Sequence, residues 1–475
     1  MSSLPSATRD TAAWDLAHES MVETLRDLIR IRSINPVPDD APDGETRAAI
    51  RIADELHDAG LRPEIVEPVA GRGSVSVRLR GDGTGGEPLL LLGHLDVVPA
   101  PPDRWTHDPF AADVADGYVW GRGAVDMKNL VAMEIAVVRL LAAEARAAGR
   151  DPGADPIPGV TRDIILTITA DEEAGGLLGV SWLVDHRPDW IRAAGAINES
   201  GAVATTFAGR RFYPIGVAER GYCVYRISVR GTWGHGSMPR PDNAAVLAAE
   251  VVTRLAVQGP PRLTSTMRAF IDGVAGRLDG EAARVLRAFG SDDPRLGEAA
   301  VDALCDADSA RVLRALLRDT VSPNVIHAGV KYNVIPGEAV VEVDCRQLPG
   351  TTEEALRETI VGRLGPDLAA ACTIELTLFG EPVDAPASGS LYDALAGAVR
   401  DHDPDGLPLP FMVPFATDAK HTARLAVPTY GFSPLRLEPD EPFLARFHGV
   451  DERVGLDALR WGLPVLYDAV RRFCG

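Results

Sequence analysis

Residues 163–173 read DIILTITADEE, an apolar run that ends in three acids. The stretch from Ile164 to Thr169 is uncharged and rich in β-branched residues, which predicts a buried strand of a parallel sheet. Open α/β folds bind ligands at the carboxyl edge of such a sheet. We therefore expect Glu172 and Glu173 to lie at a functional edge rather than on a plain surface.

Two further apolar strands end in the same kind of residue. The segment EPLLLLGHLDVV delivers His94 and Asp96, and AGAINES delivers Glu199. Residues two apart on a strand face the same way, so Asp96 can accept the second ring N–H of His94 and fix its tautomer. An isolated Glu-Glu pair is usually solvated surface charge. Three strands that end in imidazole or carboxylate instead predict a metal site.

Composition limits the class of protein and its partners. The chain has 475 residues, enough for two or three domains, with 46% apolar and 24% charged residues, as in globular proteins. Its net charge of −20 argues against nucleic-acid and anionic-membrane partners. The five cysteines are widely spaced and form no CxxC pair, so neither a disulfide framework nor a cysteine zinc site is indicated. With no signal peptide and no apolar run of ~18 residues, we expect a cytoplasmic protein.

The order of predicted elements indicates the fold class. Helices and strands alternate over residues 1–213, which predicts an α/β domain with a mixed, mainly parallel sheet and helices on both faces. From 214 to 382 the strands alternate polar and apolar residues and form a strand–helix–strand–strand–helix–strand unit, an inserted ferredoxin-like α+β domain. A hairpin with Pro-Gly at its turn is expected in this domain, and a helical insertion at about 257–322. Residues 383–475 would complete the first domain.

Seven segments resemble one known family. They are GHLDVVP, WGRGAVDMKN, ADEEAGG, INES, GHGSMP, YNVIPGEA and HGVDERV, and they follow the family's order and spacing between about residues 20 and 470. The family is that of the co-catalytic zinc metallohydrolases, which includes glutamate carboxypeptidase, aminoacylase and succinyl-diaminopimelate desuccinylase. The resemblance implies a zinc-exopeptidase-like fold with an inserted lid domain that also forms the contact of a homodimer. The insertion makes this lid larger than in the smallest members.

The resemblance implies a set of metal ligands. Asp126 would bridge two zinc ions, His94 and Glu199 would complete one site, and Glu173 and His448 the other. The three carboxylates offset most of the four positive charges, and such ligands also suit cobalt or manganese. A cis peptide bond after Asp126 is implied as well.

The remaining roles also come from the resemblance. Glu172 would be the general base and Asp96 would orient His94. His235 would hydrogen-bond the developing oxyanion, often in the partner subunit's active site, although a plain loop histidine is the alternative. Asn333 and Arg346 would hold the substrate, Arg346 by gripping a carboxylate, although it could also be an ordinary strand residue.

The predicted activity is hydrolysis of an amide or peptide bond next to a free carboxylate. The protein would be a carboxypeptidase, a dipeptidase or an N-acyl-amino-acid hydrolase that acts on a peptide or small molecule. The alternative is a non-catalytic, metal-dependent binding protein on the same fold. Asp418 and Lys420, in FATDAKH, could touch substrate or belong to a simple loop.

Overall fold

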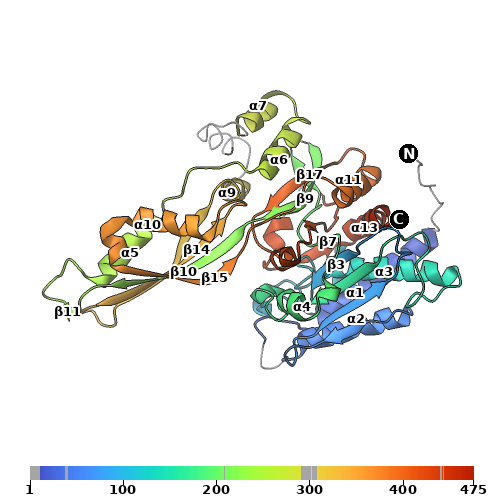
Figure 1. The fold of residues 1–475 in the computed structure, drawn as a ribbon, viewed down its shortest axis with the longest axis horizontal. Helices are drawn as coiled ribbons and strands as arrows, with labels where there is room; N and C mark the ends of the chain where they lie inside the picture. The colour runs from blue at the N-terminus through green and yellow to red at the C-terminus, as the bar shows by residue number, and fades with distance from the viewer. Residues whose placement is uncertain are drawn as a thin grey trace. The chain divides into compact units, whose positions relative to one another are not determined.

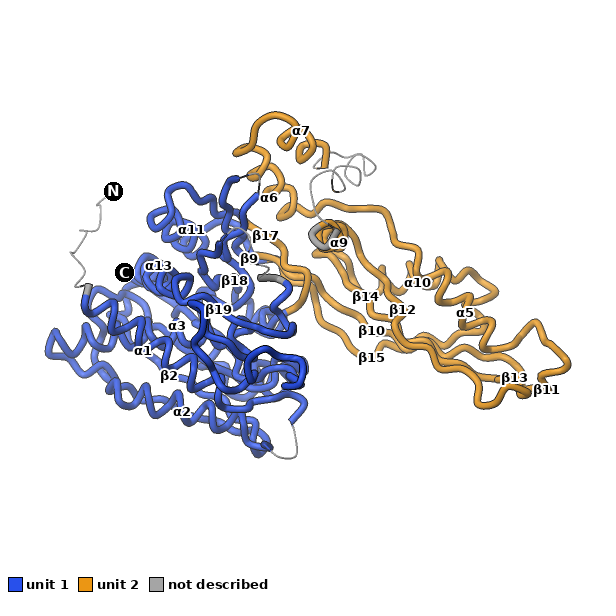
Figure 2. Tube along the Cα trace, turned by 180° about the vertical axis from the view of Figure 1, so that it is seen from behind, with its two compact units in different colours: residues 1–216, 385–409, 417–475 blue, residues 217–384, 410–416 orange. Residues whose placement is uncertain are grey.

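The computed structural model describes residues 11–37, 41–207, 209–289, 301, 307–438, 441 and 443–475. Its chain forms two compact units (Figure 2). Unit 1 comprises residues 1–216, 385–409 and 417–475, and unit 2 comprises residues 217–384 and 410–416. Among the described residues, no helix combines the length and apolar character that crossing a membrane requires.

One segment lies in a different unit from the one that the sequence indicated. Residues 410–416 were expected in the second part of the α/β domain, but they group with unit 2. The reason is that β17 (Leu407–Val413) pairs with β9 (Arg210–Glu219). In addition, Phe411 packs edge-on against Phe270, with 4.9 Å between the ring centroids. The other expected domain limits stay a prediction.

Unit 1 is built on a twisted central sheet (Figure 1). Its strands, in spatial order, are β1 (Glu64–Val66), β2 (Ser74–Leu79), β6 (Ile164–Thr169), β3 (Leu89–His94), β7 (Gly195–Asn198), β18 (Thr429–Gly431) and β9. The four central strands from β6 to β18 run parallel, whereas β1, β2 and β9 pair antiparallel with their neighbours. The predicted parallel centre is therefore confirmed, and every residue of β6 is buried.

Helices cover both faces of this sheet, as the fold class requires. Leu90 and Leu92 of β3 pack with Val180 and Leu183 of α4 (Val180–His186). Alternate residues of a strand face opposite ways. Accordingly, Gly93 faces the side covered by α3 (Lys128–Ala147). The helices α1 (Thr11–Arg30), α2 (Gly44–Asp58), α11 (Ser390–His402) and α13 (Leu456–Cys474) complete the layers.

A small sheet and short helices complete unit 1. The strands β4 (Val114–Ala115), β5 (Tyr118–Trp120) and β19 (Arg453–Gly455) form a three-stranded antiparallel sheet. A 3-10 turn at Glu172–Ala174 follows β6, and α12 (Ala419–Thr422) precedes β18.

Unit 2 has an antiparallel sheet with the ferredoxin-like strand order. The order is β12 (Thr320–Ala328), β14 (Glu338–Gln347), β10 (Gly221–Arg230) and β15 (Cys372–Gly380). The helices α5 (Ala244–Leu255) and α10 (Glu353–Ala370) pack on one face and bury a single apolar cluster with it. The expected insertion contains α6 (Ser265–Ala275), α7 (Gly280–Phe289) and α9 (Ala307–Ala315), whose apolar residues form a cluster of their own.

The expected hairpin turn at Pro336-Gly337 is wrong. Residues 329–337 separate β12 from β14, and the pair Pro336-Gly337 comes directly before β14. The connection is longer because β13 (Val334–Ile335) pairs with β11 (Gly234–His235) and forms a separate two-stranded ribbon. This ribbon carries His235, and Asn333 directly precedes its second strand.

Candidate metal centre

Three strand ends of the central sheet supply the acids and the imidazole. His94 is the last residue of β3, and Glu199 directly follows β7. After β6, Asp171 adopts a left-handed conformation with φ of 74°, which turns the chain into the 3-10 turn of Glu172 and Glu173. The carboxyl ends of these neighbouring parallel strands therefore bring the four side chains to one edge, as the sequence indicated.

Asp126 lies between two histidines. Its Oδ1 is 3.3 Å from Nε2 of His94, and its Oδ2 is 3.2 Å from Nε2 of His448. The peptide bond between Asp126 and Met127 is cis, as the resemblance implied. One carboxylate thus presents one oxygen to each imidazole.

Each histidine has a second carboxylate beside it. Nε2 of His94 is 3.8 Å from Glu199, and Nε2 of His448 is 3.1 Å from Oε2 of Glu173. His94 is almost fully buried, whereas the side chain of His448 is 52% exposed. The five side chains proposed as ligands therefore form two groups that share Asp126.

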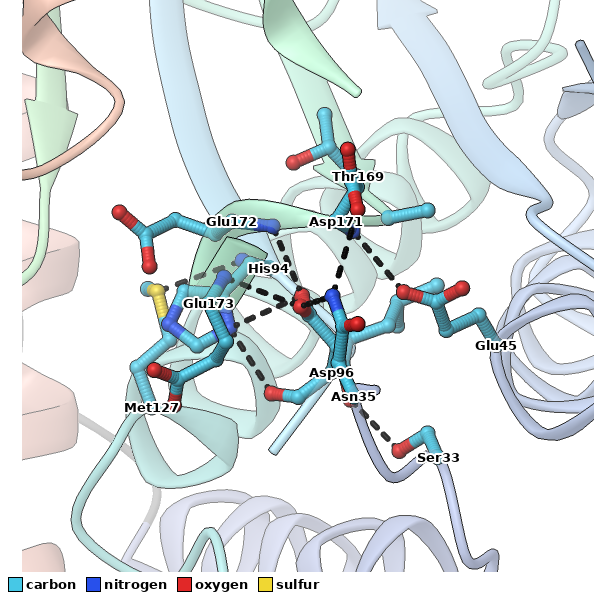
Figure 3. Close-up of polar contacts among 12 residues, drawn as sticks. Ser33, Asn35, Glu45, His94, Asp96, Met127, Thr169, Asp171, Glu172 and Glu173 are labelled. Atoms are coloured by element: carbon cyan, nitrogen blue, oxygen red, sulfur yellow. Dashed lines mark hydrogen bonds and ion pairs between the residues drawn. The ribbon is translucent and has the colours of Figure 1, made fainter. Parts of the chain in front are cut away.

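Asp96 holds the turn that carries the two glutamates (Figure 3). Its Oδ1 accepts the backbone N–H of Glu172 and its Oδ2 that of Glu173, both at 3.0 Å. Nδ1 of His94 is 3.5 Å from Oδ1 of Asp96 and 3.0 Å from its backbone oxygen. Because the backbone oxygen is an obligate acceptor, Nδ1 carries a proton, and Nε2, which faces Asp126, is the ring nitrogen that a metal would take from the neutral imidazole.

A buried polar network that the sequence did not predict supports Asp96. The Asn35 amide donates to Oδ2 of Asp96 at 2.8 Å and to Oδ1 of Asp171 at 3.3 Å. Arg72 donates to the same Asp171 oxygen at 2.7 Å and pairs with Glu45. Glu45 in turn accepts the backbone N–H of Asp171 at 2.9 Å. These residues come from segments far apart in the sequence, so no local pattern indicates their contact.

The electrostatics of the site favour a cation. Burial raises the pKa of Glu172, of Glu199 and of Glu173, the last to about 7. Burial also lowers the pKa of His94, but its contacts with Asp126, Asp96 and Glu199 outweigh burial and hold that pKa well above its usual value. Several carboxylates thus share a dry space in which their negative charges repel one another.

The donor set fits divalent metal ions. His94, Glu172 and Glu199 can each place a ligand atom within 4.8 Å of the others, and so can His94, Asp126 and Glu173. Nε2 of His94 is buried and makes no hydrogen bond within the described part of the chain, as expected of a nitrogen that binds a metal. Imidazole and carboxylate oxygen are ligands that zinc, cobalt and manganese accept. Because Glu172 also belongs to one of these groups, proximity alone does not separate a ligand from a base.

Lys420 lies beside Glu172, at 3.6 Å from its Oε1. The ammonium also donates to the backbone oxygen of Thr417 at 2.9 Å and is largely buried. Asp418 is buried as well, and its Oδ2 accepts from the Thr169 hydroxyl at 3.3 Å. Both side chains are therefore buried, and a contact of Asp418 or Lys420 with substrate stays a prediction, with a simple loop as the alternative.

The three substrate-binding candidates belong to unit 2, where they lie in two places. His235 pairs with Val334 across the ribbon, and the N–H of Gly236 donates to the backbone oxygen of Asn333 at 2.9 Å, so His235 and Asn333 are neighbours. Arg346 lies near the far end of β14, where it pairs with Asp344 at 2.9 Å. Glu338 begins β14 at the end next to the ribbon. Arg346 lies eight residues further along the strand, or roughly 26 Å away.

Comparison with known proteins places the chain in a family. The sequence matches the peptidase family M20/M25/M40 over residues 90–472, and the chain belongs to this family. It is 29% identical to a probable carboxypeptidase S-like 2 of Dictyostelium discoideum, over 81% of this chain and 71% of that protein. It is 27% identical to aminoacylase-1 of Mus musculus, over 94% of this chain and 93% of that protein.

Solved structures agree on the fold. Human carnosine dipeptidase 1 superposes with a TM-score of 0.69 at 18% identity, covering 99% of this chain and 100% of that one. A metallo-carboxypeptidase of family M20 from Sulfolobus solfataricus gives 0.69 at 15% identity, covering 95% and 99%. The protein is thus a metallohydrolase of a family whose members carry peptidase and aminoacylase names, with a mixed α/β fold and a candidate metal centre.

Proposed function

We propose that the protein hydrolyses an amide or peptide bond next to a free carboxylate, using two divalent metal ions. The position of Asp126 between His94 and His448 carries this proposal, because a carboxylate with one oxygen beside each imidazole would serve as a ligand to both ions. His94 and Glu199 would complete one site, and Glu173 and His448 the other. Such a pair of ions supplies Lewis acidity and a more acidic water, whose pKa falls toward about 7.

Glu172 is the proposed general base. Its carboxylate faces Lys420, whereas Glu173 faces His448, so the two neighbouring acids have different partners. A carboxylate held beside an ammonium remains ready to take a proton from water and pass it to the leaving amine. Asp96 keeps this base in place through the backbone of its turn and keeps the proton of His94 on Nδ1.

We further propose that His235 and Asn333 act in the active site of a partner subunit, and that Arg346 grips the substrate carboxylate. This proposal is supported by the distance that separates Arg346 from His235 and Asn333 within unit 2. A substrate of one or two amino acids cannot reach across roughly 26 Å, so one rigid unit cannot bring all three groups to the same molecule. A homodimer in which two chains contribute to each site removes this conflict.

Zinc is the proposed metal, with cobalt or manganese as alternatives, and the cytoplasm is the proposed location. Four cysteines, Cys223, Cys345, Cys372 and Cys474, are free among the described residues, as in a reducing compartment.

A metal analysis combined with a substrate panel tests the function. Protein loaded with zinc and protein treated with a chelator are each given dipeptides and N-acyl amino acids, in matched pairs with a free or an amidated carboxyl terminus. We expect two ions per chain and release of free amino acid from the free acids only, abolished by the chelator and restored by zinc. Tight binding of these compounds without any hydrolysis would favour the non-catalytic binding protein. Equal cleavage of amidated and free substrates would exclude a carboxylate grip.

A further inference from the structure

Glu452 is a fully buried acid next to the candidate metal centre, and the proposed reaction assigns it no function. Its Oε1 accepts the backbone N–H of Val125 at 2.7 Å and that of Asp126 at 3.1 Å. Its Oε2 accepts from the Arg122 guanidinium at 2.6 Å. All three of these hydrogen bonds therefore go to the short segment that ends in the proposed bridging ligand.

The arrangement resembles that of Asp96 at the turn of Glu172 and Glu173. Asp96 accepts two consecutive backbone N–H groups, those of Glu172 and Glu173. Glu452 does the same for Val125 and Asp126. In both cases a buried carboxylate fixes the backbone of a residue whose side chain points at the metal site. Each carboxyl group accepts two consecutive backbone N–H groups at once, so it restrains the turn that contains them.

Glu452 also joins this segment to the one that carries His448. It lies four residues after that histidine, and its backbone oxygen accepts the N–H of Gly121 at 2.9 Å. Directly beyond, β19 pairs with β5, with Arg453 opposite Trp120. One residue thus binds the Asp126 segment through both its side chain and its main chain, and holds it next to the His448 segment.

We propose that Glu452 is a positioning residue, which sets the Asp126 carboxylate relative to His448 and so builds the metal site formed with Glu173. The inference rests on the proposed function. It assigns Glu452 no contact with substrate or metal. Its charge is held by Arg122, a buried residue whose guanidinium also lies over the Trp105 ring, 5.2 Å from its centroid.

Metal titration of Glu452→Gln tests the proposal. Glutamine keeps the size of the side chain, but its amide group must face either Arg122 or the two backbone N–H groups, so the restraint on Asp126 loosens. Calorimetric titration of the metal-free protein with zinc, checked by chelator competition, gives the two dissociation constants. We expect the second equivalent to bind about 10- to 100-fold more weakly, as on loss of other supporting contacts. The first equivalent should change less, because β3 and β7 hold His94 and Glu199.

Two control variants separate positioning from general damage. Asp451→Asn alters the neighbouring carboxylate, which accepts from the N–H and hydroxyl of Thr106 at 2.7 and 2.8 Å and does not hold Asp126. Asp403→Asn breaks a buried acid–arginine pair elsewhere in unit 1, where Arg211 donates at 2.8 Å. Both should keep the wild-type zinc constants, although Asp403→Asn should lower the melting temperature. If Glu452→Gln does not fold, Arg122→Lys replaces it and should weaken the second equivalent in the same direction.

The results would separate a failure of the positioning role of Glu452 from a failure of the proposed hydrolase function. Two zinc constants within threefold of wild type in Glu452→Gln would overturn the positioning role while leaving the hydrolase intact. An equal weakening in Asp403→Asn would overturn it too, since the effect would then be one of stability. A wild-type protein that binds fewer than two ions would overturn both.

Discussion

Replacing Asp96 by Asn tests how far one carboxylate organises the site. The side chain accepts three donors, the N–H groups of Glu172 and Glu173 and the amide of Asn35. An Asn of the same shape has a single acceptor oxygen. At best it keeps the two donors at Oδ2 and turns its own amide group toward the N–H of Glu172.

The expected cost follows from these contacts. One buried N–H without an acceptor costs about 1–3 kcal/mol, and the two remaining bonds lose the strength that an ionised acceptor gives them. We therefore expect the metal-free protein to lose about 3 kcal/mol or more of unfolding free energy. Because the turn carries Glu173, zinc should also bind about 10- to 100-fold more weakly.

Urea denaturation in chelator and zinc titration measure the two effects. The matched control is Asp163→Asn, directly before β6, the strand whose other end leads to Glu172 and Glu173; its carboxylate accepts from Gly81 and Arg78. This variant should keep the wild-type zinc constants. An unfolding free energy within 0.5 kcal/mol of wild type for Asp96→Asn, or an unchanged zinc affinity, would refute the role given to this carboxylate.

Three further predictions concern substrate, charge and core. Arg346→Ala should raise KM strongly in steady-state kinetics while metal content stays at the wild-type level, whereas lost metal would contradict a substrate role. Glu134 is fully buried and has no hydrogen-bond partner among the described residues, and burial raises its pKa well above the usual value. Its protonated form is therefore favoured in the native state, and its contribution to stability is lost as pH rises above its unfolded pKa. Glu134→Leu should accordingly raise the urea midpoint more at pH 8 than at pH 5, and an equal gain at both would show that Glu134 does not titrate. Leu166→Ala, in the buried strand β6, should cost about 2–5 kcal/mol in urea denaturation, and a cost below about 1 kcal/mol would mean a poorly packed sheet.

The fold class and the strand ends could be predicted from the sequence because they depend on local periodicity. The apolar run before Glu172 and the one before His94 each predicted a strand to within one or two residues. After the 3-10 turn of Glu172–Ala174, the helix α4 begins only at Val180. Gly175 and Gly176 both have positive φ, and they extend the turn that carries the acids.

Contacts between segments far apart in the chain could not be predicted from the sequence. The Asn35, Arg72 and Glu45 network depends on a tertiary arrangement that no spacing records. Glu452 lies within the HGVDERV segment that drew attention to His448, yet only the structure shows which backbone groups it accepts. The grouping of residues 410–416 with unit 2 likewise depends on the pairing of β17 with β9.

The central claim is that the two adjacent glutamates do different work, Glu172 as base and Glu173 as ligand. Glu172→Gln and Glu173→Gln differ from wild type by one charge each and from one another by one position, so each is the control for the other. Metal content and turnover are measured on both after zinc loading. We predict that Glu172→Gln keeps two ions but loses about 10²-fold or more in kcat, whereas Glu173→Gln loses one ion. Loss of an ion from Glu172→Gln with two ions retained in Glu173→Gln would contradict the account.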